Sequence, residues 1–300
     1  MTSPMRPSQR GKLLRRGFTL VELLISMLVA SIIGAALVRM VLSQARFMDQ
    51  QEAWREARSV SRGGINRLLS DLRAVEAGGL QAAAAGGQDF TVRVPYAFGV
   101  LCGIGGAIFT VSLLPVDATM FAEPGYTGFA IRGTNGTYTY HASNVLPAPG
   151  TTALCLNGLY DSIHTLPAFN GSPAGTILNL VRTAGALAPP LPSRGSVVYM
   201  YRDIRYEFKA SVAIPGRIGL WRTMVSTGAT EELAAPFDAT ARVNFYNLDV
   251  TPAQAAVPPL LNVRGLELRL NGMSERTPSG SAAPKTATLT TSVFFENRTD

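Results

Sequence analysis

The chain has 300 residues, of which 47% are hydrophobic and 16% are charged. This length and composition suffice for one sizeable hydrophobic core or two small ones, and they exclude a chain that is disordered throughout. The formal net charge of +7 would suggest nucleic acid or an anionic membrane as partner. Five cations lie within the first sixteen residues, however, and no later cluster of Lys or Arg is interleaved with aromatic residues. The sequence therefore predicts no nucleic-acid partner.

An apolar run, FTLVELLISMLVASIIGAALV, occupies residues 18–38 and directly follows Arg15 and Arg16. Its length matches the roughly 20 apolar residues that cross a bilayer as a helix. Because basic residues favour the cytoplasmic side, residues 1–17 are predicted to lie in the cytoplasm and everything after Arg39 on the opposite side. The sequence thus predicts a single membrane-spanning helix with a cytoplasmic N-terminus.

Glu22 is the one ionisable residue inside this run. A carboxylate in the hydrocarbon of a bilayer is costly unless it lies near the interface or has a partner. One explanation is that Glu22 reaches the headgroups at the cytoplasmic end of the helix, and the other is that a neighbouring molecule supplies a positive charge. A simple anchor or a cleavable secretory signal would have a neutral residue here.

The basic leader and the start of the apolar run resemble the class III signal of type IV prepilins and type II secretion pseudopilins, through Arg15-Arg16-Gly17-Phe18-Thr19-Leu20-Val21-Glu22. The resemblance implies that a prepilin peptidase cleaves after Gly17 and methylates the new amino terminus of Phe18. It also implies that the carboxylate of Glu22 pairs with the terminal ammonium of a neighbouring subunit. Such a pair is strong in a low-dielectric setting when its geometry and desolvation are matched.

The same resemblance implies a type IV pilin fold of the α+β class, in which a long N-terminal helix packs on an antiparallel β-sheet domain. It implies a single-pass protein of the bacterial inner membrane whose C-terminal domain lies in the periplasm and later in a pilus at the cell surface. The implied partners are prepilin peptidase, other major and minor pilins, the inner-membrane assembly platform and the lipid bilayer. No cofactor and no enzymatic activity are expected.

Helical periodicity continues beyond the span, over residues 39–79, where apolar residues recur at spacings of three and four beside charged ones. This pattern predicts an amphipathic continuation of the helix. Gly63 and Gly64 indicate a bend or the close approach of another backbone, and Gly78 and Gly79 are predicted to end the helix. The apolar stripe consists of Val60, Leu68, Leu69, Leu72 and Val75.

Residues 80–300 are predicted to form a β-rich globular domain, because short runs of β-branched and aromatic residues alternate with turn signals. Asn135-Gly136 suits a tight hairpin turn between strands at residues 128–132 and 137–141. Antiparallel pairing is expected because no helical crossovers intervene. Loops are predicted at residues 184–195 and 273–285, and a subdivision near residue 190 is left open. The other predicted strands are residues 90–94, 107–114, 176–182, 197–209, 220–225, 242–246, 263–270 and 286–296.

Several of the later strands resemble the sheet region of large minor pilins of the PilW kind, and they are also similar to minor pseudopilin J of type II secretion. This resemblance implies a minor pilin that contributes to filament initiation or to the filament tip, and the size of the globular part agrees with a minor rather than a major subunit. One alternative is a minor pseudopilin of a type II secretion system. The segments concerned are residues 197–208, 220–222, 263–270 and 286–297.

Other features leave alternatives of different classes. Cleavage by ordinary signal peptidase near Gly34-Ala35-Ala36 would release a soluble protein, but it leaves Glu22 unexplained. A membrane-anchored exported enzyme or binding protein is an alternative of another class. The two histidines, His141 and His164, lie in no zinc-binding spacing, however, and no acidic cluster matches a calcium loop, so no metal site and no catalytic residue is predicted.

Cys102 and Cys155 are the only cysteines, and both follow the apolar run. If this part of the chain is exported into an oxidising compartment, the two can form a disulfide. The alternative is two small, buried and unreactive thiols.

Overall fold

The computed structural model describes residues 19–121, 123–150, 175–183, 192–248 and 252–295. The chain divides into two units, Met1–Gln50 and Gln51–Asp300, and each is described by itself. Helix α1 (Leu20–Leu72) contributes residues to both units. The predicted leader at residues 1–17 and the predicted mature terminus at Phe18 lie outside the described residues.

In the first unit, the described chain is the N-terminal part of α1. Each residue from Thr19 to Asp49 is exposed. The hydroxyls of Ser26 and Ser31 donate to the carbonyl oxygens of Glu22 and Leu28, both at 2.7 Å, so the helix satisfies these polar groups itself. Among the described residues, α1 is the one helix long and apolar enough to cross a membrane, with an 18-residue window of mean hydropathy 2.4.

In the second unit, the C-terminal part of α1 packs on a large antiparallel β-sheet, which confirms the predicted α+β class. Leu68 and Leu72 are fully buried, as the apolar stripe predicted, and Val60 and Leu69 are partly buried. Earlier in the helix the buried residues are small rather than large, and their spacing of about four residues keeps them on one face. They are Ala53, Ala57, Ser61 and Gly64.

The helix ends at Leu72, whereas the sequence pattern extended it to Gly79. The chain leaves the helix through tighter turns, in which the amides of Ala74 and Val75 donate to carbonyl groups three residues earlier. Val75 is buried in the core although it lies beyond the helix. Gly78 then adopts a φ of 77°. The segment predicted as a last helical turn is therefore a bend that leads into the sheet.

One thirteen-stranded sheet is present in the described residues, with a central order β11-β12-β10-β9-β8-β2-β3-β7-β6. All ten predicted strands are found, whereas β1, β6, β10 and the short helix α2 (Pro115–Met120) were not predicted. A short 3-10 helix, η3 (Leu260–Asn262), precedes β12. The strands are β1 (Leu80–Ala83), β2 (Asp89–Gly105), β3 (Ile108–Leu113), β4 (Gly128–Arg132), β5 (Tyr138–Ala142), β6 (Ala148–Pro149), β7 (Thr176–Val181), β8 (Val197–Ala210), β9 (Ile218–Met224), β10 (Thr230–Phe237), β11 (Arg242–Asn247), β12 (Val263–Met273) and β13 (Thr286–Phe294).

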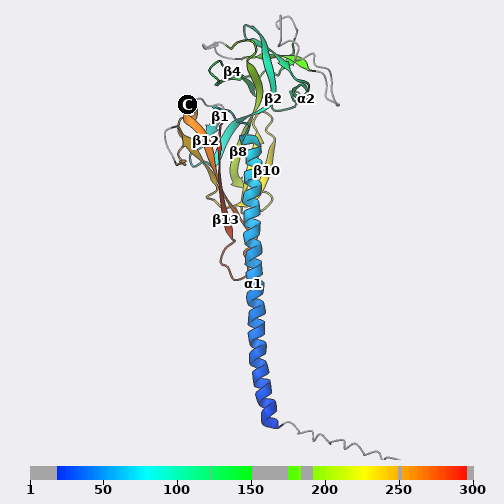
Figure 1. Cartoon of the computed structure of the whole chain (residues 1–300), viewed down its shortest axis with the longest axis vertical. Helices are drawn as coiled ribbons and strands as arrows, with labels where there is room; N and C mark the ends of the chain where they lie inside the picture. Colours follow the sequence, from blue (N-terminus) through cyan, green and yellow to red (C-terminus); the bar gives the residue numbers. More distant parts are fainter. Residues whose placement is uncertain (1–18, 122, 151–174, 184–191, 249–251, 296–300) are drawn as a thin grey trace, which may run out of the picture. The chain divides into compact units, whose positions relative to one another are not determined.

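Strands β2 and β8 are the longest in the sheet and pair antiparallel from Asp89↔Glu207 to Val100↔Val197 (Figure 1). Their two ends contribute to different hydrophobic cores. Phe90 and Tyr206 belong to a core that includes the C-terminal part of α1, whereas Leu101 and Val198 belong to a core with β3, β4 and β7. Both cores therefore share the same two strands.

The Asn135-Gly136 turn is confirmed. Strands β4 and β5 pair from Gly128↔Ala142 to Arg132↔Tyr138, and Gly136 adopts a φ of 81°. The side chain of Asn135 accepts a hydrogen bond from the backbone amide of Thr137 at 3.2 Å, which fixes the turn.

Candidate assembly and membrane segment

The first turn of α1 is capped by Thr19 and Glu22. The backbone amide of Glu22 donates to Oγ1 of Thr19 at 3.2 Å, and the backbone amide of Thr19 donates to Oε2 of Glu22 at 3.3 Å. This reciprocal pair is a capping box, which satisfies amides that have no partner within the helix. Glu22 therefore has a role within its own chain that the sequence analysis missed, although the Thr-x-x-Glu spacing indicates it.

The surface of α1 beyond this cap is largely apolar and has no partner among the described residues of its own unit. Seventeen large hydrophobic side chains from Leu20 to Met48 are exposed, with Leu28 at 63% and Ile33 at 55%. Burying one such side chain stabilises a structure by about 1.5–3 kcal/mol. Exposed apolar surfaces of this size mark sites of contact with lipid or with other proteins.

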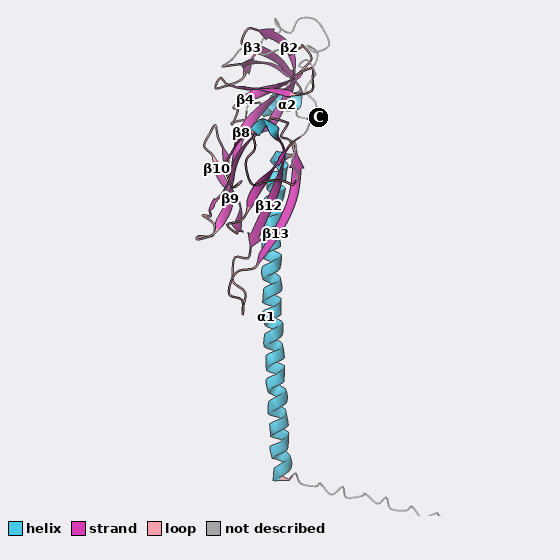
Figure 2. Ribbon diagram, turned by 90° about the vertical axis from the view of Figure 1, so that its left-hand side faces the viewer, coloured by secondary structure: helices cyan, strands magenta, loops and turns pink. Residues whose placement is uncertain are grey.

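The C-terminal part of α1 is fastened to the sheet through Ser61, which is fully buried. Its hydroxyl donates to the carbonyl oxygen of Ala287 at 2.8 Å and accepts a hydrogen bond from the backbone amide of Gly272 at 2.7 Å. Gly272 and Ala287 face each other across β12 and β13, which lie beside this part of α1 (Figure 2). One serine thus connects the helix to two neighbouring strands.

Glycine permits this close contact. A Cβ atom at Gly272 would overlap the carbonyl oxygen of Ala57, and one at Gly64 would lie 2.9 Å from Cζ of Phe237. Both positions leave too little room for a larger residue. The sequence predicted a bend or the close approach of another backbone at Gly63-Gly64. Gly64 is instead approached by the side chains of Phe237 and Leu270, and Gly63 has nothing within 4 Å of its hypothetical Cβ.

Near its C-terminal end, α1 is held to β8 and β9 by Asp71. Its carboxylate accepts hydrogen bonds from the hydroxyl of Tyr206 and from Nε of Arg222, the latter at 3.0 Å. Arg222 also pairs with Glu231 at 3.1 Å. Burial and the neighbouring Asp71 raise the pKa of Tyr206 well above its ordinary value, so the tyrosine stays protonated and donates to the carboxylate.

The remaining predicted residues have these positions. Glu22 lies in the first turn of α1, and Gly17 and Phe18 lie outside the described residues. Cys102 is buried in β2, and the described part of the chain contains no free cysteine. Cys155 lies outside that part, so the disulfide between the two stays a prediction.

His141 has a structural environment. It lies in β5, and its ring centroid is 5.7 Å from that of Phe109 and 5.2 Å from that of Phe129. Burial, with a smaller contribution from Arg182, lowers its pKa from 6.5 to about 4, so the imidazole is neutral near pH 7. His164 lies outside the described residues. Within the described ranges, no group of three or more His, Cys, Asp or Glu side chains is arranged to hold a metal ion.

Residues 13–38 match the prokaryotic N-terminal methylation motif. The match includes Gly17, Phe18 and Glu22 and covers the predicted span. It supports a type IV pilin-like or pseudopilin-like protein, and with it processing by prepilin peptidase, assembly with other pilins and membrane anchoring. Comparison with curated proteins and with solved structures gave no match.

Proposed function

We propose that this protein is a minor pilin that is assembled into a type IV pilus and contributes to filament initiation or to the filament tip. The observation that carries the proposal is the methylation motif at residues 13–38, on a helix whose apolar surface is exposed from Leu20 to Met48. A helix of this kind is stable in a bilayer before assembly and among other pilin helices afterwards.

The proposed order of events begins in the inner membrane. Prepilin peptidase removes residues 1–17 and methylates the amino group of Phe18, and the β-rich domain lies in the periplasm. The proposed boundaries are 18–38 for the membrane or filament-core helix, 39–72 for its continuation and 80–300 for the globular domain, with the bend after Leu72 between the last two. The protein is a structural component of the machine, without a catalytic residue of its own.

Glu22 has two successive roles in this proposal. In the separate subunit its carboxylate caps the first turn of α1. During assembly the same carboxylate meets the terminal ammonium of a neighbouring subunit, where the low dielectric strengthens the attraction. The capping bonds are 3.3 Å long, at the weak end of hydrogen-bond geometry, so an ion pair with a neighbouring subunit can replace them.

The finer assignment to minor pilins of the PilW kind rests on the strand segments at residues 197–208 and 263–270 and on the size of the globular unit. A minor pseudopilin of a type II secretion system has the same architecture. Neighbouring genes distinguish the two, because pilus-assembly genes accompany the first and a secretion operon accompanies the second.

Two substitutions at Glu22 test the proposal. Glu22→Gln retains an oxygen that can cap the helix but removes the charge, and Glu22→Ala removes both. We expect both variants to remain in the inner membrane and both to be strongly depleted from sheared filaments, as measured by quantitative immunoblotting of the two fractions. If Glu22→Gln enters filaments normally, the role of Glu22 is to cap the helix and the proposed ion pair is refuted. If the wild-type protein is absent from filaments, the pilin role is contradicted.

A further inference from the structure

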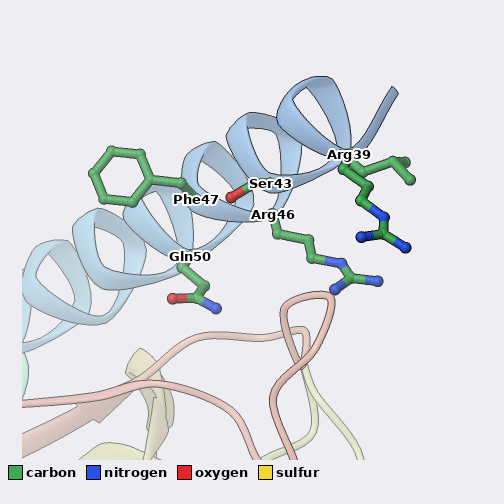
Figure 3. A pocket seen from close by; sticks show the side chains of 6 residues that line it. Arg39, Ser43, Arg46, Phe47 and Gln50 are labelled. Carbon is green, nitrogen blue, oxygen red and sulfur yellow. The ribbon is translucent and has the colours of Figure 1, made fainter. Parts of the chain in front are cut away.

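Two arginines follow the apolar run on one face of α1. Arg39 and Arg46 are seven residues apart, which is about two helical turns or 10 Å along the axis. Figure 3 shows both side chains, with that of Gln50, projecting toward the same side of the helix. They line a groove of about 580 Å³ with Leu42, Ser43 and Phe47. The face therefore combines cationic, polar and apolar side chains.

The position of this face along the helix matches the far boundary of a bilayer. From Leu20 to Arg39 the helix rises about 28 Å, which is close to the thickness of the hydrocarbon core. With Leu20 near the cytoplasmic boundary, Arg39 lies at the opposite one and Arg46 about 10 Å beyond it, where its long side chain reaches back to the headgroups. Leu42 and Phe47, exposed at 53% and 62%, supply the apolar contacts typical of an interface.

Neither arginine has an acidic partner in the described residues, where the ion pairs involve Arg202, Arg205, Lys209 and Arg222. The guanidinium groups of Arg39 and Arg46 are therefore available to an external anion. Guanidinium groups bind phosphate through paired hydrogen bonds, and each arginine near an anionic membrane adds attraction.

We propose that Arg39 and Arg46 form a binding site for the headgroups of anionic phospholipids in the outer leaflet of the inner membrane. The site holds the subunit in the bilayer at a fixed depth before it enters a filament. This proposal rests on the membrane insertion contained in the proposed function. Phospholipid is favoured over an acidic protein surface because the face begins where the apolar span ends.

The test uses the full-length protein, processed in cells and reconstituted into vesicles of phosphatidylcholine with phosphatidylglycerol. Native mass spectrometry of protein released from these vesicles gives the ratio of the two lipids bound. The variant is Arg39→Gln/Arg46→Gln, and Arg58→Gln/Arg62→Gln is the matched control, because it removes the same charge from exposed residues further along α1. A third protein, Arg39→Lys/Arg46→Lys, retains the charge.

We expect wild-type protein to prefer phosphatidylglycerol and the Arg39→Gln/Arg46→Gln variant to lose about 20- to 30-fold of that preference, which corresponds to about 1 kcal/mol for each arginine. The matched control and the lysine variant should keep most of it. Equal binding of both lipids by the wild type, or an equal loss in the matched control, would overturn the proposal.

Two further outcomes separate this proposal from the proposed function. If the glutamine variant keeps its lipid preference but no longer enters filaments, the arginines bind an acidic surface of a neighbouring subunit and the lipid site is refuted. If the wild-type protein is extracted from cell membranes by alkaline carbonate, it does not span the bilayer, and the proposed function fails together with this site.

Discussion

Within α1, Leu28 is 63% exposed and Leu68 is fully buried, although both are leucines of one continuous helix. The N-terminal part, from Leu20 to Val38, presents large apolar side chains in every direction. The C-terminal part, from Gln51, buries one face that begins with small residues and ends with large ones. The first pattern suits an environment that is apolar all round, and the second suits packing against a single sheet.

The difference between the two parts of α1 shows that the surroundings of a helix determine the size of the side chains on its surface. Lipid and neighbouring helices adapt to bulky side chains, whereas a sheet of the same chain has a fixed surface. Where β12 comes closest to α1, the contact requires Gly272 on the strand and Ser61 on the helix. Residues that contribute no large apolar surface are therefore essential to this contact.

The largest expected effect is that of Leu68→Ala. Removing a fully buried leucine should lower the free energy of unfolding by about 2–5 kcal/mol, because a cavity remains in the core. Leu28→Ala makes the same chemical change in the exposed part and should alter it by no more than about 0.5 kcal/mol. Denaturant unfolding of the full-length protein in detergent measures both. Similar losses in the two variants would contradict the distinction between the two parts of α1.

A smaller loss is expected for Ser61→Ala. The substitution leaves the amide of Gly272 and the carbonyl group of Ala287 without their buried partner, which should cost about 1–3 kcal/mol of unfolding free energy. Ser70→Ala is the control, because the exposed Ser70 hydroxyl bonds only the carbonyl oxygen of Arg67 in its own helix. The same unfolding experiment applies, and equal stability of both variants would show that Ser61 does not fasten the helix.

The adjacent glycines should respond with opposite signs. Gly63→Ala places its Cβ in open space and should stabilise the helix by about 0.5–1 kcal/mol. Gly64→Ala brings its Cβ to 2.9 Å from Phe237 and should destabilise the protein by about 1–3 kcal/mol. Thermal unfolding of the two variants shows whether each substitution raises or lowers Tm. If Gly64→Ala raises Tm, the side chain of Phe237 can move to make room for the added methyl group.

The last effect is confined to acidic pH. The pKa of His141 is lowered to about 4, whereas a histidine in the unfolded chain titrates near 6.5. Between these values the unfolded state binds more protons, so the contribution of His141 to stability is complete above pH 6.5 and decreases as the pH falls toward 4.

His141→Phe retains a ring between Phe109 and Phe129 but cannot be protonated. The variant should therefore lose less stability than wild type between pH 7.5 and pH 5, as measured by the change in Tm. If the Tm of His141→Phe depends on pH as that of the wild type does, a group other than His141 causes the loss of stability at acidic pH.

Much of the fold could be predicted from local patterns. The apolar run at residues 18–38 predicts where α1 begins. Short runs of β-branched and aromatic residues that alternate with turn residues predict ten strands. Strand β10 could not be predicted, because Glu231, Glu232 and Pro236 are poor strand residues. Its partners lie elsewhere: Glu231 pairs with Arg222, and the carboxylate of Glu232 accepts hydrogen bonds from the amides of Val212 and Ala213.

The candidate site shows the same limit. Glu22 was recognised because a charge in an apolar run is conspicuous, yet its bond to Thr19 was missed although the capping spacing is visible in the sequence. Ser61 could not have been found, since its function depends on β12 and β13, more than 200 residues away. Sequence patterns reveal residues that conflict with their neighbours, but not residues whose partners are remote.

The proposed function depends on the removal of residues 1–17 and on the methylation of the new amino terminus at Phe18. The most direct test is the intact mass of the mature protein from cells with and without prepilin peptidase. We expect a chain that begins at methylated Phe18 only when the peptidase is present. A chain that begins at Thr19 or later, for example at Leu37, or that keeps its arginine-rich leader in the presence of the peptidase, would contradict it.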